Sequence, residues 1–207
     1  MPRDRFATRA AILRSAAELV AAHGVNAVGV NALAQAAGCD KVLIYRYFGG
    51  LDGVLAALGM ERMLWPRVEV DSNGGGADRD GDASLAELMQ SVVLEEWAAF
   101  AGGALMLQAE VAELEGGNAL GRAAAAQRSE RHAEIIASLR ANHRIPPYVD
   151  LEALLELLSA ALTLFALRAA SGSATKTARM LEPSTPEGWR RIEKTVGTIV
   201  RALLESE

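Results

Sequence analysis

The chain has 207 residues, of which 51% are hydrophobic and 5% aromatic, and this length predicts one or two compact units. Ala and Leu outnumber the β-branched residues, which favours helix over sheet. The net charge of −5 is divided unevenly, because residues 1–67 carry 8 Lys and Arg against 5 Asp and Glu, and residues 68–207 carry 13 against 21. The single cysteine excludes an intrachain disulfide. Since neither a signal-peptide core nor an apolar run of about 18 residues is visible, we expect a cytoplasmic protein without a membrane partner.

Four helices are predicted in the first third of the chain, because apolar residues there recur at the spacing of one helical face. Glycines at positions 24, 38 and 49–50 separate them, since glycine readily adopts the left-handed backbone that ends a helix. The predicted helices cover about Phe6–His23, Val30–Ala37, 40–48 with Asp40 as the N-cap, and Leu51 to near Trp65. Their expected inner faces contain Leu13, Ala16, Ala17 and Val20, then Val30, Leu33, Ala34 and Ala37, and finally Leu51, Val54, Leu55 and Leu58.

The stretch 69–84 is polar, acidic and rich in glycine, so we expect it to form a flexible linker. Its aspartates do not predict a calcium loop, because Ala83 and Met89 stand where an EF-hand needs glycine and glutamate. The rest of the chain predicts further helices at about Leu85–Ala101, Ala104–Leu114, Ala119–Asn142, Asp150–Ala170 and Pro186–Leu204. Since no strand pattern or repeat appears, the expected architecture is all-α, with a small head and a larger body.

The second and third predicted helices, joined by a turn at Gly38, have the order of a helix-turn-helix. In the third helix, Ile44 and Phe48 lie four residues apart and are expected to face the core, with Cys39 as a buried thiol. The residues left outside are Lys41, Val42, Leu43 and Arg46, with Tyr45 and Tyr47 at the flanks. Such a face suits DNA, because cations and tyrosine hydroxyls can contact phosphates and aliphatic side chains can contact thymine methyl groups. Alternatively, the tyrosines and Val42 pack against the fourth helix.

The segment "ILRSAAELVAAHGVNAVGVNALAQAAGCDKVLIYRYFGGLDGVL", residues 12–55, resembles the DNA-binding head of TetR/AcrR-type transcriptional regulators. It has that family's order of a first helix ending at glycine, the stretch "LAQAAG", a turn, and Tyr45-x-x-Phe48. The resemblance implies that Lys41, Val42 and Leu43 approach bases and that Tyr45 and Tyr47 approach the DNA backbone. It also implies a helix-turn-helix DNA-binding domain at 1–50, a connecting helix at 51–68, the linker at 69–84, and a ligand-binding and dimerisation domain at 85–207.

Three departures from the family pattern suggest weaker DNA binding. Val28-Gly29 replaces the usual Thr at the start of the second helix, Asp40 replaces Ser, and Leu51 replaces a Lys. Two phosphate contacts are thereby lost, and the carboxylate of Asp40 repels phosphate although it caps a helix well. The head is therefore expected to bind DNA weakly or to use the N-terminal arginines Arg3, Arg5 and Arg9.

Two functions are open to the predicted body, namely dimerisation and ligand binding. The last two helices carry continuous apolar faces, which suit an intermolecular four-helix bundle or, alternatively, the core of one subunit. The apolar stripe of the last helix is expected to contain Trp189, Ile192, Val196, Ile199 and Leu203. Bulky residues near glycine breaks or in apolar helices are candidates for an apolar ligand pocket, namely Trp97, Phe100, Met106 and Phe165.

The titratable residues of the body do not predict a metal centre or an active site. Glu95, Glu96 and Glu110 are expected to face water, although they would favour a cationic ligand if they turned inward. His132 and His143 lack metal-ligand spacing and are expected to lie at the surface or in hydrogen bonds. Since catalytic motifs are also missing, we expect no enzyme activity, no metal and no cofactor.

The sequence therefore predicts a homodimeric transcriptional regulator that binds double-stranded DNA, most simply a repressor released from a palindromic operator by a small, largely apolar effector. The alternative is an architectural or assembly protein that binds DNA and whose body contacts another protein. A ligand bound in the body would favour the regulator.

Overall fold

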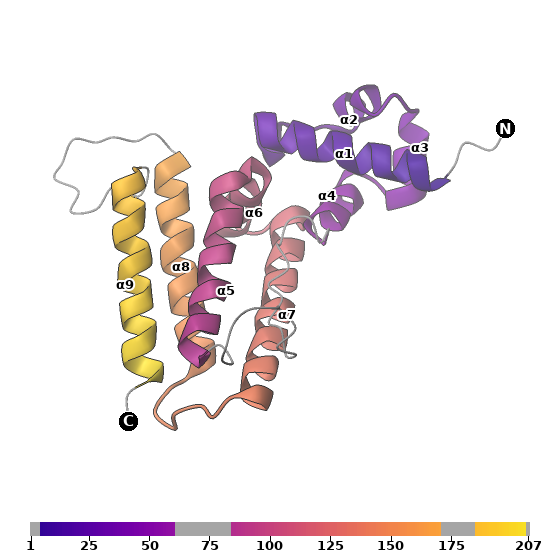
Figure 1. Ribbon diagram of the computed structural model, residues 1–207. Coiled ribbons are helices and arrows are strands. Elements are labelled where there is room, and N and C mark those ends of the chain that lie inside the picture. The colour runs from indigo at the N-terminus through magenta and orange to yellow at the C-terminus, as the bar shows by residue number, and fades with distance from the viewer. Residues whose placement is uncertain (1–4, 61–83, 171–184, 206–207) are drawn as a thin grey trace. The chain divides into compact units, whose positions relative to one another are not determined.

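The computed structural model describes residues 5–60, 84–170 and 185–205, and every regular element within these ranges is a helix (Figure 1). The expected all-α fold is thus confirmed. The predicted linker, apart from Ser84, lies outside the described residues, as do Arg3 and the part of the predicted fourth helix beyond Met60.

The N-terminal helices lie where the glycine spacing predicts them. They are α1 (Arg5–His23), α2 (Val30–Ala36), α3 (Lys41–Phe48) and α4 (Leu51–Gly59). A short 3-10 helix that the sequence did not predict, η1 (Val25–Ala27), follows α1. Gly24 and Gly49 have φ angles of 79° and 77°, which glycine adopts at low cost, and Gly49 has the left-handed conformation that commonly ends a helix.

The remaining helices also match their predicted ranges to within about one residue at each end. They are α5 (Leu85–Gly102), α6 (Ala104–Leu114), α7 (Ala119–Asn142), α8 (Leu151–Ala170) and α9 (Pro186–Leu204). The start of α9 shows why: Thr185 caps the helix by accepting a hydrogen bond from the Gly188 N–H at 3.0 Å, and Pro186 follows at the first helical position.

The chain forms two compact units, and α7 contributes to both. The first unit contains α1, η1, α2, α3, α4, α6 and α7 up to Ser129. The second contains α5 up to Ala101, α7 from Glu130, α8 and α9. The domain boundaries expected at positions 50, 68 and 84 stay predictions, because the two units group helices by contact and not by order along the chain.

The core of the first unit joins α1, α2, α3 and α4. Ile12, Leu33 and Ile44 are fully buried there, and burial of each such side chain stabilises the fold by about 1.5–3 kcal/mol. The buried face of α1 contains Ile12, Ser15, Ala16 and Val20. The prediction was right for Ala16 and Val20 and wrong for Leu13 and Ala17, which are half-buried.

Two glycines allow α4, α6 and α7 to pack at backbone distance in the first unit. A Cβ atom at Gly59 would lie 2.7 Å from the Leu120 carbonyl oxygen, and one at Gly121 would lie 2.5 Å from the Glu113 nitrogen. Real Cβ atoms do not approach backbone this closely, so only glycine fits at both crossings. These contacts fix α4, which follows the helix-turn-helix, against α7.

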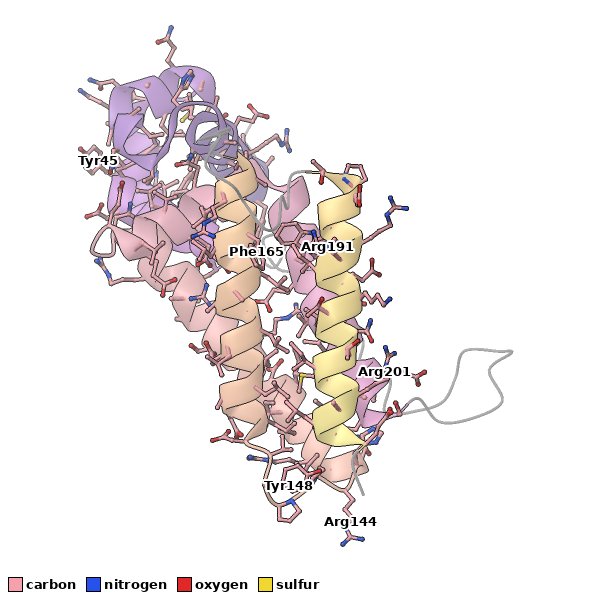
Figure 2. The ribbon with its side chains drawn as sticks, turned by 90° about the vertical axis from the view of Figure 1, so that its left-hand side faces the viewer. Tyr45, Arg144, Tyr148, Phe165, Arg191 and Arg201 are labelled. Carbon is pink, nitrogen blue, oxygen red and sulfur yellow. The ribbon has the colours of Figure 1, made fainter. Side chains whose placement is uncertain are left out.

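In the second unit, α8 and α9 lie side by side and antiparallel (Figures 1 and 2). The inward stripe of α9 contains Ile192, Val196, Val200 and Leu204. The predicted stripe was wrong at its end, because Ile199 and Leu203 are exposed. From Val196 onward, the buried residues of α9 therefore follow one another at intervals of four residues and not three.

The sequence was expected to contain no segment that could span a bilayer, but one helix of the structure passes that test. By length and composition α8 is apolar enough to cross a membrane, and α3 and α4, bent by 57° at Gly49-Gly50, pass the same test together. However, α8 also contributes buried leucines to the second unit, and its Glu152 accepts a hydrogen bond from Arg140 at 2.7 Å. A core helix of a soluble protein has the same composition, so this is weak evidence for a membrane.

Candidate nucleic-acid interface

A tight turn at Gly38 joins α2 to α3. Gly38 has a φ angle of 61°, and the Cys39 N–H donates to the Ala34 carbonyl oxygen at 3.0 Å. Asp40 then begins α3, because its side-chain oxygen accepts a hydrogen bond from the Val42 N–H at 2.9 Å. The predicted cap is confirmed, and the turn has the geometry of a helix-turn-helix.

The outer face of α3 combines cations, an aliphatic side chain and an aromatic ring. Ile44 is 0% exposed, whereas Val42 is 61% and Tyr45 55% exposed. Lys41 and Arg46 are also exposed, and Tyr45 lies at the outer edge of the head in Figure 2. Val42 therefore does not pack against α4, whereas the Tyr45 ring, although more than half exposed, lies beside Gly50 at the start of α4.

The flanks of α3 are more buried than the sequence suggested. Leu43 and Tyr47, both expected outside, are half-buried, and so are Phe48 and Cys39, both expected inside. Since α3 packs against α2 and α4, and arginines of α1 lie against its Tyr47 and Phe48, the side chains next to the buried Ile44 are partly covered. Leu43 and Tyr47 can still reach a partner at the edge of the exposed face.

Two arginines of α1 contact the end of α3 within the first unit. Arg9 donates from Nη1 to the Tyr47 carbonyl oxygen at 3.1 Å, and its guanidinium lies 4.4 Å from the centroid of the Phe48 ring. Arg5 is exposed and lies 5.8 Å from the centroid of the Tyr47 ring. Of the arginines expected to support DNA binding, Arg9 is therefore occupied by contacts with α3.

The three departures from the family pattern have clear structural positions. Val28 is buried and offers no polar group, and Gly29 provides a cap for α2 without a side-chain hydrogen bond. The carboxylate of Asp40 caps the N-terminus of α3. Leu51 is half-buried at the first position of α4, where a lysine could extend its amine into solvent.

The residues predicted to line a ligand pocket do not all belong to one compact unit. Trp97, Phe100 and Phe165 belong to the second unit and Met106 to the first. Trp97 and Met106 are buried, and Phe165 is half-buried on α8 (Figure 2). The side chain of Phe100 lies outside the part of the chain that the structure describes.

Trp97 is stacked on Trp189, with ring centroids 4.0 Å apart and ring planes inclined by 11°. The pair joins α5 to α9 in the second unit. An offset stack of two indoles stabilises by about 0.5–1.5 kcal/mol beyond the burial of their surface. Trp97 is therefore a packing residue of the body.

A polar cluster that the sequence did not predict joins α5, α7 and α8, and it consists of the buried Glu96, His132 and Ser159 with the exposed Glu156. His132 Nε2 lies 3.3 Å from an oxygen of Glu96, and its Nδ1 lies 2.9 Å from an oxygen of Glu156. The Ser159 hydroxyl donates to the other Glu96 oxygen at 2.6 Å. Ionised carboxylates only accept hydrogen bonds, so both ring nitrogens can donate only if the imidazole is protonated.

The protonated imidazole is also favoured electrostatically. Burial alone would lower the pKa of His132, but the hydrogen bonds and negative charges of Glu96 and Glu156 outweigh it and raise the pKa. The expectation that Glu96 faces water was wrong, since Glu96 is 5% exposed. The helical spacing could have indicated this, because Glu96 follows Met89 by seven residues and Val92 by four, and both are buried.

Glu110 was also expected to face water but is buried in the first unit. Its carboxylate pairs with Arg128, which also donates to Glu113 at 2.9 Å. The bridge joins α6 to α7, so the burial of Glu110 is compensated by a cation and not by a ligand. Glu95 is half-buried and accepts from the Ser91 hydroxyl at 3.2 Å.

An apolar strip is exposed on α8 and α9 in the second unit. On α8 it includes Leu157, which is 70% exposed, and Leu164, which is seven residues further on the same face. Small residues lie between these leucines, and α9 adds Ile199 and Leu203. Exposed apolar residues that line up on neighbouring helices are typical of a protein interface.

Comparisons with known proteins agree with this arrangement. Residues 12–58 match the profile of bacterial regulatory proteins of the tetR family. The structure is similar to that of the fatty acid degradation regulator FadR from Bacillus halodurans, with a TM-score of 0.63 and 16% identity over 93% of each chain. It is also similar to a tetR-type regulator from Streptomyces avermitilis, with a TM-score of 0.63 and 20% identity over 97% of this chain and 99% of that one.

A third similar structure is that of FadR from Bacillus subtilis in complex with stearoyl-CoA. Its TM-score is 0.60, with 15% identity over 92% of this chain and 96% of that chain. A comparison with curated protein sequences found no significant match. The resemblance predicted from sequence is confirmed: residues 12–58 match the profile of the tetR family of bacterial regulatory proteins, and the described residues share the all-helical fold of these structures.

Proposed function

We propose that this protein is a sequence-specific DNA-binding transcriptional regulator whose α3 enters the major groove. The observation that carries the proposal is the contrast between the two faces of α3, with Ile44 fully buried and Val42 and Tyr45 largely exposed between Lys41 and Arg46. Base edges, thymine methyl groups and phosphates would provide a partner for each of these side chains.

Each exposed residue of α3 has a role that follows from its chemistry. Lys41 and Arg46 neutralise phosphates or donate to guanine, and Val42 contacts thymine methyl groups with Leu43 at the edge of the face. The hydroxyls of Tyr45 and Tyr47 donate to phosphate oxygens, which orients the helix in the groove. These six residues are the proposed DNA-binding site.

A homodimer follows from the small size of one head. One eight-residue helix reads few base pairs, but two heads about one turn of DNA apart read a palindrome. The exposed strip on α8 and α9 supports a dimer interface that pairs two helices from each copy into a four-helix bundle. The strip consists of Leu157, Ala160, Ala161 and Leu164 on α8 and Thr195, Ile199, Ala202 and Leu203 on α9.

The regulator acts as a repressor that a small, largely apolar effector releases from DNA. The complex of FadR from Bacillus subtilis with stearoyl-CoA supports an apolar ligand in a body of this fold. Of the candidates from the sequence, Trp97 and Phe165, which both belong to the second unit, are the proposed contacts. The effector favours a body arrangement in which the two heads no longer match successive major grooves, so it lowers DNA affinity through its different affinity for the two arrangements.

Selection of bound sequences from random duplexes by the purified protein tests this function. We expect enrichment of a palindrome whose half-sites lie one helical turn apart. If repeated rounds enrich no sequence, or enrich single half-sites without symmetry, DNA reading by a dimer is wrong. Acyl-CoA thioesters of graded chain length, added to the protein on the selected duplex, then test for an apolar effector by release of the DNA.

A further inference from the structure

The recognition helix α3 is fixed at both of its ends by groups outside the helix. At its start, Asp40 accepts from the Val42 N–H. At its end, the Gly49 N–H donates to the Tyr45 carbonyl oxygen, and Arg9 of α1 donates to the Tyr47 carbonyl oxygen at 3.1 Å. Carbonyl groups at a helix end have no partner within the helix, so Arg9 satisfies one that would otherwise need water.

The same guanidinium also packs on an aromatic ring of α3. Arg9 lies 4.4 Å from the centroid of the Phe48 ring, and its side chain is half-buried between α1 and α3. Its positive charge at the C-terminal end of α3 is favourable with the helix dipole. A planar guanidinium can stack on a ring and donate in its own plane at the same time, which the ammonium group of lysine cannot do.

We propose that Arg9 is a positioning residue for DNA recognition, which sets the angle of α3 without contacting DNA itself. The proposal rests on the proposed function, because the angle matters only if α3 reads a groove. A helix of eight residues has little stability of its own, so its direction depends on such tertiary contacts. Rotation about the buried Ile44 would move Lys41 and Arg46 away from the base edges without unfolding the head.

The test compares the affinity of each variant for the selected palindrome and for a random duplex, at several salt concentrations. The variants are Arg9→Gln, Arg9→Lys and, as a charge-matched control, Arg14→Gln, which removes an exposed arginine from the same helix. For Arg9→Gln we expect a loss of about tenfold in the ratio of specific to random affinity, the size of one charge-assisted hydrogen bond. The salt dependence of random binding should stay that of the parent, since no phosphate contact is removed.

The Arg9→Lys variant distinguishes a positioning role of Arg9 from phosphate binding. If Arg9 bound a phosphate, Arg9→Lys would keep the charge and therefore the contact. If Arg9 positions α3, lysine cannot replace it, because an ammonium group cannot stack and donate in one plane. We therefore expect the selectivity of Arg9→Lys to fall nearly as far as that of Arg9→Gln. Arg14→Gln should keep the parent's selectivity. The proposal is overturned if Arg9→Gln weakens specific and random binding equally and reduces the salt slope by about one, or if Arg9→Lys binds like the parent.

A second readout does not require DNA. Amide hydrogen exchange in the full-length protein should accelerate over residues 42–49 in Arg9→Gln relative to Arg14→Gln, with the core amides of α1 unchanged. If the parent binds no DNA at all, the proposed function fails, while faster exchange in α3 would still show that Arg9 holds this helix. Equal exchange in the two variants would overturn the role of Arg9.

Discussion

At the scale of single residues, Lys41 and Tyr45 provide a matched test of the DNA-binding face. Lys41→Ala should weaken DNA binding and reduce the salt slope by about one, because one phosphate neutralisation is lost. Tyr45→Phe should weaken binding by about fivefold to tenfold without changing the slope, because it removes a neutral hydrogen bond and keeps the ring. Fluorescence anisotropy at several salt concentrations measures both, and parental binding by both variants would show that this face does not meet DNA.

The buried imidazole of His132 predicts how the stability of the body depends on pH. Since its pKa is raised in the folded protein, His132 contributes stability that is fully present below the unfolded pKa of about 6.5 and is lost as the pH rises through the folded pKa. The difference in free energy of unfolding between the parent and His132→Gln should therefore fall from pH 6 toward alkaline pH, as measured by denaturant titration.

Glu156→Gln serves as a second variant for this effect. It removes the negative charge from one of the two acceptors of His132 but leaves the imidazole and Glu96 in place. The pH dependence attributed to His132 should become smaller in this variant, because less negative charge favours the protonated ring. A stability difference that is constant with pH in both variants would mean that His132 is held neutral.

At the scale of helices, the start of α4 offers a gain of function. Leu51→Lys places a cation at the position where related heads carry one, so DNA binding should tighten and the salt slope should increase by about one. The cost is small, because a lysine in the first turn opposes the helix dipole by about 0.3–1 kcal/mol and Leu51 is only half-buried. Titration at low and high salt checks this, and an unchanged slope would mean that α4 begins too far from the phosphates.

The packing of α6 on α7 makes another prediction at this scale. Gly121→Ala should lower the free energy of unfolding by about 1–3 kcal/mol, because the new Cβ would lie 2.5 Å from the Glu113 backbone nitrogen. Gly197→Ala in α9 is the matched control, since the atoms nearest to its new Cβ belong to the end of the flexible Gln90 side chain, which can move aside. Thermal unfolding should show a large loss for the first and little change for the second, and equal behaviour would argue against the tight crossing.

The sequence predicted helix ends better than helix faces, for a physical reason. Gly24, Gly38 and the glycine pair at 49–50 act locally through backbone conformation, so they mark helix ends whatever the tertiary structure. The burial of Glu96 depends instead on His132 and Ser159, which lie on other helices and are more than 35 residues away in sequence. No local pattern shows that these three side chains meet, and the contact of Arg9 with α3 was missed for the same reason.

At the scale of the whole molecule, the exposed strip of the second unit predicts dimerisation. Leu157→Glu should break the dimer, because it places two carboxylates in an apolar interface without a cation to pair with them. Leu114→Glu is the control, since Leu114 of α6 is 73% exposed and lies outside the strip. Analytical ultracentrifugation should show a monomer for the first variant and a dimer for the second, and a dimer in both would place the interface elsewhere.

The most direct measurement of the central claim, that the outer face of α3 reads the major groove, is methylation interference on the selected duplex. Methyl groups on guanine N7 lie in the major groove, where Lys41 and Arg46 are proposed to approach base edges. We predict interference at two clusters of guanines, one in each half-site and about one helical turn apart. Strong binding that is indifferent to guanine methylation in the major groove would contradict the account.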